Sequence, residues 1–100
     1  MKASEKSIIR EWARAIQNEY DRADGHFKDL QEMSRKCGLP AYCSAQVNCE
    51  QITASAAASS ADKSRAGTLY NQYVTANAKE DALRSLLSAL ASDSGEGFSY

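Results

Sequence analysis

The sequence predicts an all-α protein: a small helical bundle in which a long N-terminal helix packs against two or three shorter helices. Proline occurs once and glycine five times in 100 residues, so few positions interrupt a helix. Alanine, glutamate, glutamine and lysine are abundant, and apolar residues recur every three or four positions over most of the chain. Because much of the 43% hydrophobic content is alanine, we expect a thin core and modest stability.

The clearest helical pattern occupies the first third of the chain, from Ser4 to Cys37. One row of residues repeats every seven positions and a second row is offset from it by four, and we call the two rows the N-terminal seam. The rows are Ile9, Ile16, Ala23, Leu30 and Cys37, and Ala13, Tyr20, Phe27 and Ser34. A helix of about 34 residues is roughly 50 Å long. That length is about twice the diameter of a compact domain of this size, which predicts an elongated bundle or an end left for a partner.

The limits of this first helix are marked by local signals. Ser4 is the candidate N-cap, with Ser7 as a later alternative. The segment Cys37–Pro40 contains a glycine suited to the C′ position followed by a proline that stops the helix. Gly25 follows Asp24 in a turn-like dipeptide and could divide the segment into two antiparallel helices. Because the seven-residue spacing does not shift across Gly25, we predict one continuous helix, with the broken helix as the alternative.

A second helix of about 16 residues is predicted from Ser44, its N-cap, to Ser59. Its apolar positions are Val47, Cys49, Ile52 and Ala56. The following stretch, residues 54–61, consists almost entirely of alanine and serine. Such small side chains allow another helix to approach closely, although a weakly specified spacer explains the composition equally well.

Residues 62–92 contain two competing signals. Leucine and alanine at positions 69, 76, 83 and 90 keep a seven-residue spacing, which fits one helix. Asn77 and Glu80 have the spacing of a capping box, which would begin a new helix before the leucine cluster. We predict two helices in near-continuous register, with a single helix as the alternative. Residues 1–92 then form one helical domain, and the polar residues 93–100 form a flexible tail.

Side chains that could support chemistry are few. Cys37, Cys43 and Cys49 are spaced too widely for the ligand pairs of structural zinc sites, and an odd cysteine count fits a reducing compartment. His26 has no nucleophile or base near it in the sequence, and no glycine-rich phosphate loop occurs. The sequence therefore predicts a non-enzymatic protein with no catalytic residues, no metal site and no cofactor.

The charge balance narrows the choice of partners. Twelve basic residues against thirteen acidic ones give a net charge of −1, which does not match the basic footprint of a nucleic-acid binder. The sequence has neither a run of 18 apolar residues nor an N-terminal signal core. We expect a cytoplasmic protein that does not bind membranes and does not contact nucleic acid directly.

Six residues are predicted as contacts to a protein partner. Trp and Tyr side chains dominate protein interfaces, and the best cationic line of the chain lies on the first helix. The candidates are Trp12, Tyr42 and Tyr70, with Lys6, Arg10 and Arg14. For Trp12 a position in the core fits the sequence equally well, and a solvated face is the alternative for the cationic line. They lead to the hypothesis of a protein-binding inhibitor that acts by occlusion. The alternative is a self-associating helical protein with a structural or regulatory role, contacting nucleic acid through its cationic line.

The opening segment SIIREWARAIQNEYDRADGHF, followed by the Ala/Ser-rich middle of the chain, resembles the small phage-encoded anti-CRISPR proteins of the type I-F inhibitor class. This resemblance implies a stoichiometric binder of the crRNA-guided surveillance complex that acts in the host cytoplasm and prevents target DNA from being engaged or unwound. The near-neutral charge of this chain differs from the strongly acidic members that mimic DNA. It therefore favours binding to a protein subunit of the complex.

Overall fold

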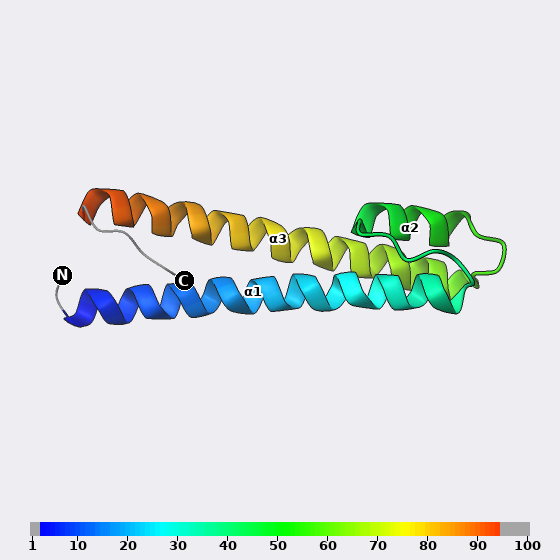
Figure 1. Cartoon of the computed structure of the whole chain (residues 1–100), viewed down its shortest axis with the longest axis horizontal. Coiled ribbons are helices and arrows are strands. Elements are labelled where there is room, and N and C mark those ends of the chain that lie inside the picture. Colours follow the sequence, from blue (N-terminus) through cyan, green and yellow to red (C-terminus); the bar gives the residue numbers. More distant parts are fainter. Residues whose placement is uncertain (1–2, 95–100) are drawn as a thin grey trace.

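The computed structural model describes residues 3–94, with side-chain detail for residues 6–89. Within this range the chain forms three helices, α1 (Ala3–Lys36), α2 (Ala45–Ala54) and α3 (Ser60–Ser94). Helices α1 and α3 lie antiparallel and side by side, and α2 covers both at one end (Figure 1). We call this end the three-helix end. The opposite end, where α1 begins and α3 finishes, is the two-helix end.

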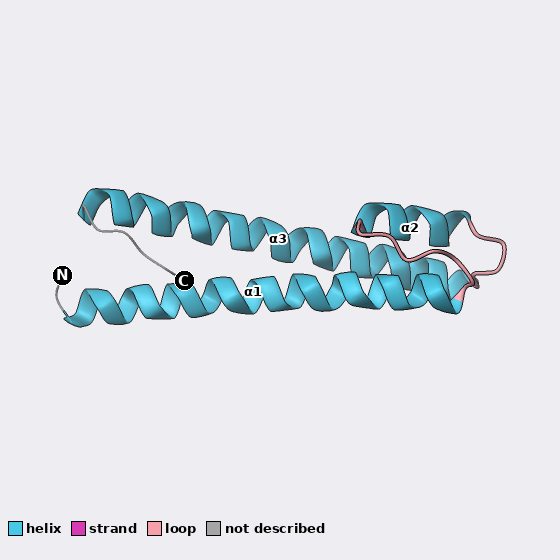
Figure 2. Ribbon diagram, viewed as in Figure 1, coloured by secondary structure: helices cyan, strands magenta, loops and turns pink. Residues whose placement is uncertain are grey.

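The predicted all-α helical bundle is confirmed, although α3 is as long as α1 (Figure 2). The molecule measures 58 × 17 × 16 Å, and its radius of gyration is 17.9 Å, compared with about 13 Å for a compact domain of this length. The elongated bundle expected from the length of the first helix is therefore present. No helix within residues 3–94 combines the length and the apolar character needed to cross a membrane.

Helix α1 is continuous through Gly25, as the unbroken spacing of the N-terminal seam predicts. The seam faces the other helices, because Ile16, Ala23 and Leu30 are all buried. The helix begins at Ala3, so the prediction of an N-cap at Ser4 or Ser7 is wrong, because both residues lie within the helix.

The end of α1 has the predicted capping geometry. Gly38 adopts a φ of +73° in the left-handed region, which glycine enters without steric cost. Its N–H donates to the carbonyl of Arg35 at 2.9 Å, and the Leu39 N–H donates to the carbonyl of Ser34 at 2.8 Å. This pair of hydrogen bonds is the Schellman motif, which satisfies the last carbonyl groups of the helix.

Gly25 and Gly38 provide a matched pair of substitutions that tests this description of α1. A Cβ added at Gly25 would meet no atom within 4 Å on an exposed helical surface, so Gly25→Ala should raise the free energy of unfolding by about 0.5–1 kcal/mol. Gly38→Ala should lower it by about 1–2 kcal/mol, because alanine is strained at positive φ. Urea denaturation followed by circular dichroism measures both. A destabilised Gly25→Ala variant would indicate a break in the helix.

Helix α2 is shorter than predicted. Ser44 is its N-cap, and the Ser44 hydroxyl accepts a hydrogen bond from the Val47 N–H at 3.3 Å, as expected. The helix ends at Ala54, where Ser55 turns to an extended conformation, so the prediction that it continues to Ser59 is wrong. The small residues that follow carry no large apolar side chain to hold a further helical turn against α1 and α3.

A capping box that the sequence analysis overlooked starts α3. The Ser59 hydroxyl accepts a hydrogen bond from the Asp62 N–H at 3.1 Å, and the Asp62 carboxylate accepts one from the Ser59 N–H at 3.4 Å. This reciprocal pair satisfies two N–H groups at the helix start. It fixes the point at which the chain reverses and returns along α1.

The prediction of two helices within residues 62–92 is wrong, because α3 is unbroken from Ser60 to Ser94. Asn77 and Glu80 lie inside it and do not form a capping box. The seven-residue spacing that the sequence also showed continues through them, so contact with α1 favours a continuous helix over a new start. The predicted domain boundary after residue 92 falls within α3. Residues 95–100 of the predicted tail, and the side chain of Leu90, lie outside the described parts of the structure.

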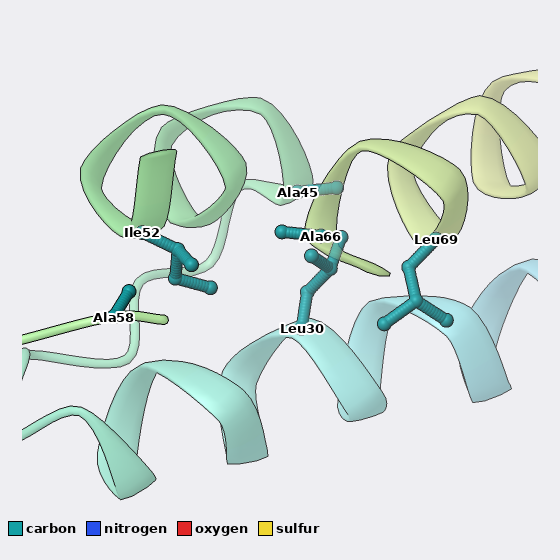
Figure 3. Close-up of a cluster of buried hydrophobic side chains, with 6 residues drawn as sticks. All are labelled: Leu30, Ala45, Ile52, Ala58, Ala66 and Leu69. Atoms are coloured by element: carbon teal, nitrogen blue, oxygen red, sulfur yellow. The ribbon is translucent and has the colours of Figure 1, made fainter. Parts of the chain in front are cut away.

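The hydrophobic core is concentrated at the three-helix end. Its buried residues come from all three helices and from the turn before α3, and they are Leu30, Ala45, Ile52, Ala58, Ala66 and Leu69 (Figure 3). Toward the two-helix end the buried apolar residues of the described chain are Ile16, Ala23, Ala76 and Leu87. The two-helix end therefore has fewer buried apolar residues than the core cluster, against which partly buried residues such as Phe27, Met33 and Tyr73 also pack.

Candidate functional site

The connection between α1 and α2 is held in one place by a buried asparagine. Asn48 is fully buried, and its side-chain carbonyl accepts a hydrogen bond from the Tyr42 N–H at 2.9 Å. Its Nδ2 donates to the Tyr42 carbonyl at 2.9 Å, and Gln31 on α1 donates to the same carbonyl at 3.0 Å. The backbone of Tyr42 is therefore anchored to two helices, while 45% of the residue remains exposed.

A second anchor lies closer to the end of α1. Gln51 donates from Nε2 to the hydroxyl of buried Ser34 at 3.0 Å, and also to the carbonyl of Pro40. Asn48, Gln51 and Ser34 form a polar network within a mainly apolar core, and their hydrogen bonds hold the loop against α1. Neither Asn48 nor Gln51 is among the residues predicted from the sequence. The burial of Asn48 could have been predicted from its position, because it lies one helical turn before Ile52 on the same face of α2.

A hollow of about 260 Å³ lies just beyond the loop and α2, where only the two long helices continue. We call it the junction hollow. Its walls belong to α1, α3 and the loop, and the lining residues are Tyr20, Ala23, Asp24, Phe27, Cys43, Tyr73, Asn77 and Glu80. The hollow therefore lies on the same side of the long helices as α2.

Aromatic rings and a small residue give the hollow its shape. Phe27 and Tyr73 lie across the α1–α3 interface, with ring centroids 6.2 Å apart and planes inclined by 39°. Tyr20, one heptad before Phe27, is 50% exposed because α2 does not reach this far. Ala23 between them is buried and short, so it leaves space above it. The hollow lies beside the core cluster, against which Phe27 and Tyr73 pack, and it is open where no third helix covers Tyr20.

Two carboxylates lie beside these rings, and each has a basic partner on its own helix. Asp24 is 2.7 Å from the Lys28 ammonium, and the hydrogen bond and charge of Asp24 raise the pKa of Lys28. Glu80 is 8% exposed and accepts hydrogen bonds from Nε and Nη2 of Arg84 at 3.1 and 2.9 Å. A site of this composition suits an apolar side chain or one with a cationic end.

The three cysteines are free and differ in exposure. Cys43, which lines the junction hollow, is exposed, whereas Cys37 and Cys49 are half-buried. Cys49 donates from Sγ to the Ala66 carbonyl at 3.5 Å, and burial, followed by the charge of Glu50, raises the pKa of its thiol. Across the described residues, no three His, Cys, Asp or Glu side chains are grouped so that they could hold a metal ion.

The six contact residues expected from the sequence lie on separate surfaces. Trp12 is half-buried at the two-helix end, and Tyr70 is half-buried against the core cluster. Tyr42 is exposed beside the junction hollow. The three cationic residues are exposed on α1 toward the two-helix end, and they are Lys6, Arg10 and Arg14. The structure thus brings only Tyr42 close to the hollow, while Tyr20, Phe27 and Tyr73 supply its aromatic surface.

No family model matches this chain, and neither a curated protein nor a solved structure is significantly similar to it.

Proposed function

We propose that this chain is a non-enzymatic, protein-binding protein that receives a partner side chain in the junction hollow. The observation that carries the proposal is a concave aromatic surface whose loop wall is fixed by buried hydrogen bonds. Partly exposed aromatic residues in a preformed recess are typical anchors of protein interfaces. A rigid wall reduces the ordering cost of binding.

The resemblance of the opening segment to type I-F anti-CRISPR inhibitors supplies the proposed partner. We infer that the partner is a crRNA-guided surveillance complex and that binding occludes one of its protein subunits, which blocks target DNA binding or unwinding. The mixed charge around the hollow supports contact with protein, since carboxylates and cations alternate there and form no continuous stripe of either sign. An apolar side chain ending in an ammonium or guanidinium group is the best match.

The test uses a purified type I-F surveillance complex and isothermal titration calorimetry. Tyr20→Ala should weaken binding by about tenfold or more, because it removes the most exposed ring of the hollow. Val74→Ala is the matched control, since Val74 is 45% exposed on α3 outside the hollow. Circular dichroism checks that both variants keep the wild-type helix content.

Three results would count against the proposal. Absence of heat and of co-elution with the complex would rule out this partner. Equal affinity of the Tyr20→Ala and wild-type proteins would rule out the junction hollow as the binding site. In a DNA-retention assay, binding of the complex without any loss of target DNA engagement would reject inhibition by occlusion.

A further inference from the structure

An apolar patch lies at the two-helix end, on the side of the long helices that faces away from α2. Its members lie on two seven-residue rows of α1 and on two such rows of α3. They are Ile8, Trp12, Ala15, Ala82, Leu86 and Ala89. We call this set the end patch. Leu86 is 55% exposed and Ile8 is 48% exposed, the two largest values among the large aliphatic residues of the described chain.

A second hollow, farther along the same side of the long helices, identifies the side on which the end patch lies. That hollow is lined by Glu19 and Arg22 of α1 and by Thr75 and Lys79 of α3, among others. Trp12 lies seven residues before Glu19, and Leu86 lies seven residues after Lys79. Residues seven apart on a helix occupy nearly the same angular position. The end patch therefore continues this side of the molecule.

Farther along the same side, polar and charged residues replace most of the apolar ones, although Met33 continues the row of Trp12. Toward the three-helix end the same rows carry charged side chains, among them Asp29, Lys36 and Arg65. On the α2 side at the two-helix end, the corresponding rows carry Arg10 and Gln17. A localised apolar patch with a polar rim indicates a protein interface. It also lies where the core between α1 and α3 is thinnest.

We propose that a second copy of this chain covers the end patch, with the two hairpins facing each other about a two-fold axis parallel to their length. In this arrangement α1 of one copy lies beside α3 of the other, and all neighbouring helices are antiparallel. The result is a four-helix bundle in which the two end patches form a second apolar layer. This proposal does not depend on the proposed function, because the junction hollow lies on the opposite side.

Charge complementarity at the rim favours a second copy as the occupant. The contacts between Phe27 and Tyr73 and between Lys36 and Asp62 fix the antiparallel register of α1 and α3. In this register Glu19 and Lys79 lie at the same height along the bundle. Rotation about a two-fold axis parallel to the helices does not change that height, so Glu19 of each copy lies beside Lys79 of the other. Glu19 already pairs with Arg22 of its own helix at 2.6 Å, so Lys79 of the other copy adds a second basic partner to each Glu19 at the inner edge of the shared patch.

The dimer would present its two junction hollows on outward-facing sides. Each hollow lies on the α2 side of its own copy, away from the shared interface. If a partner offers two equivalent subunits, linked hollows would bind it more tightly than one hollow alone.

Sedimentation equilibrium tests the dimer directly. The wild-type chain should have twice the single-chain mass of 10.9 kDa, whereas Leu86→Lys should have the single-chain mass. Val74→Lys is the matched control, because it places the same charge on a similarly exposed residue of α3 outside the end patch, and it should stay dimeric. Circular dichroism confirms that both variants are folded. A wild-type chain of single-chain mass, or a dimeric Leu86→Lys variant, would overturn the proposal.

A charge-exchange experiment tests the arrangement of the two copies. Glu19→Lys and Lys79→Glu are prepared with different affinity tags, unfolded together and refolded. Only a mixed dimer has opposite charges at both inter-copy contacts, whereas each variant alone has like charges there. The mixed dimer should exceed its statistical share by severalfold at low salt and lose that excess at high salt. A statistical mixture would overturn the proposed axis, even if the chain is dimeric.

Discussion

Leu30→Ala should lower the free energy of unfolding by about 2–5 kcal/mol, the largest loss we expect from any single truncation in the described chain. Leu30 is fully buried where α1, α2 and α3 meet, and its neighbours in the cluster are themselves mostly alanine (Figure 3). Small neighbours fixed to helix backbones cannot move in to fill the cavity. Domains of this size have a total stability of about 5–15 kcal/mol, so the variant should be partly unfolded near physiological temperature.

Urea denaturation followed by circular dichroism measures this loss, with all proteins at one chain concentration. Val74→Ala is the control, because Val74 is 45% exposed and its truncation should change the stability by less than about 0.5 kcal/mol. A Leu30→Ala variant as stable as the control would show that α2 does not pack over Leu30 in solution. The melting of α2 alone, at a lower urea concentration than the long helices, would lead to the same conclusion.

The N-terminal seam was the most predictable part of the fold, for a physical reason. Its seven-residue spacing runs for about 34 residues without interruption, so helix geometry alone assigns Ile16, Ala23 and Leu30 to one buried face. Gly38, followed by Leu39 and Pro40, was predictable as the end of this helix, because glycine enters the left-handed region without steric cost and proline cannot continue a helix.

The helix limits in the second half of the chain were less predictable, because capping signals there compete with packing. Asn77 and Glu80 have the same spacing as Ser59 and Asp62, yet only the second pair caps a helix. The difference lies outside the local sequence. Residues 55–59 must reverse the chain, whereas the segment around Asn77 remains in contact with α1 over its whole length.

The junction hollow depends on where α2 ends, so the sequence could supply only its parts. Tyr20 and Phe27 were assigned to the N-terminal seam, but a position on the seam does not show whether a third helix lies above it. Because α2 covers only one end, Phe27 packs against the core while Tyr20 stays half exposed. The buried network of Asn48 could not be predicted, because its partner is the backbone of a loop.

Asn48→Ala should lower the free energy of unfolding by about 1–3 kcal/mol and release the loop that walls the junction hollow. The substitution leaves the Tyr42 N–H without its acceptor and removes one of two donors to the Tyr42 carbonyl. Cys43, which follows Tyr42 in the loop, should then react faster with iodoacetamide near neutral pH. Cys49 should still react slowly, because burial disfavours its thiolate. Affinity for the partner should also fall, since the wall must be ordered again on binding.

Gln46→Ala is the matched control for Asn48→Ala, because Gln46 lies on the same helix and its hydrogen bond to Glu50 is on the surface. It should change the stability by less than about 0.5 kcal/mol and leave the Cys43 reaction rate unaltered. Equal rates in all three proteins would show that the loop does not depend on Asn48. A faster Cys43 reaction with unchanged partner affinity would show instead that the loop wall takes no part in binding, and the site would then be limited to Tyr20, Phe27 and Tyr73.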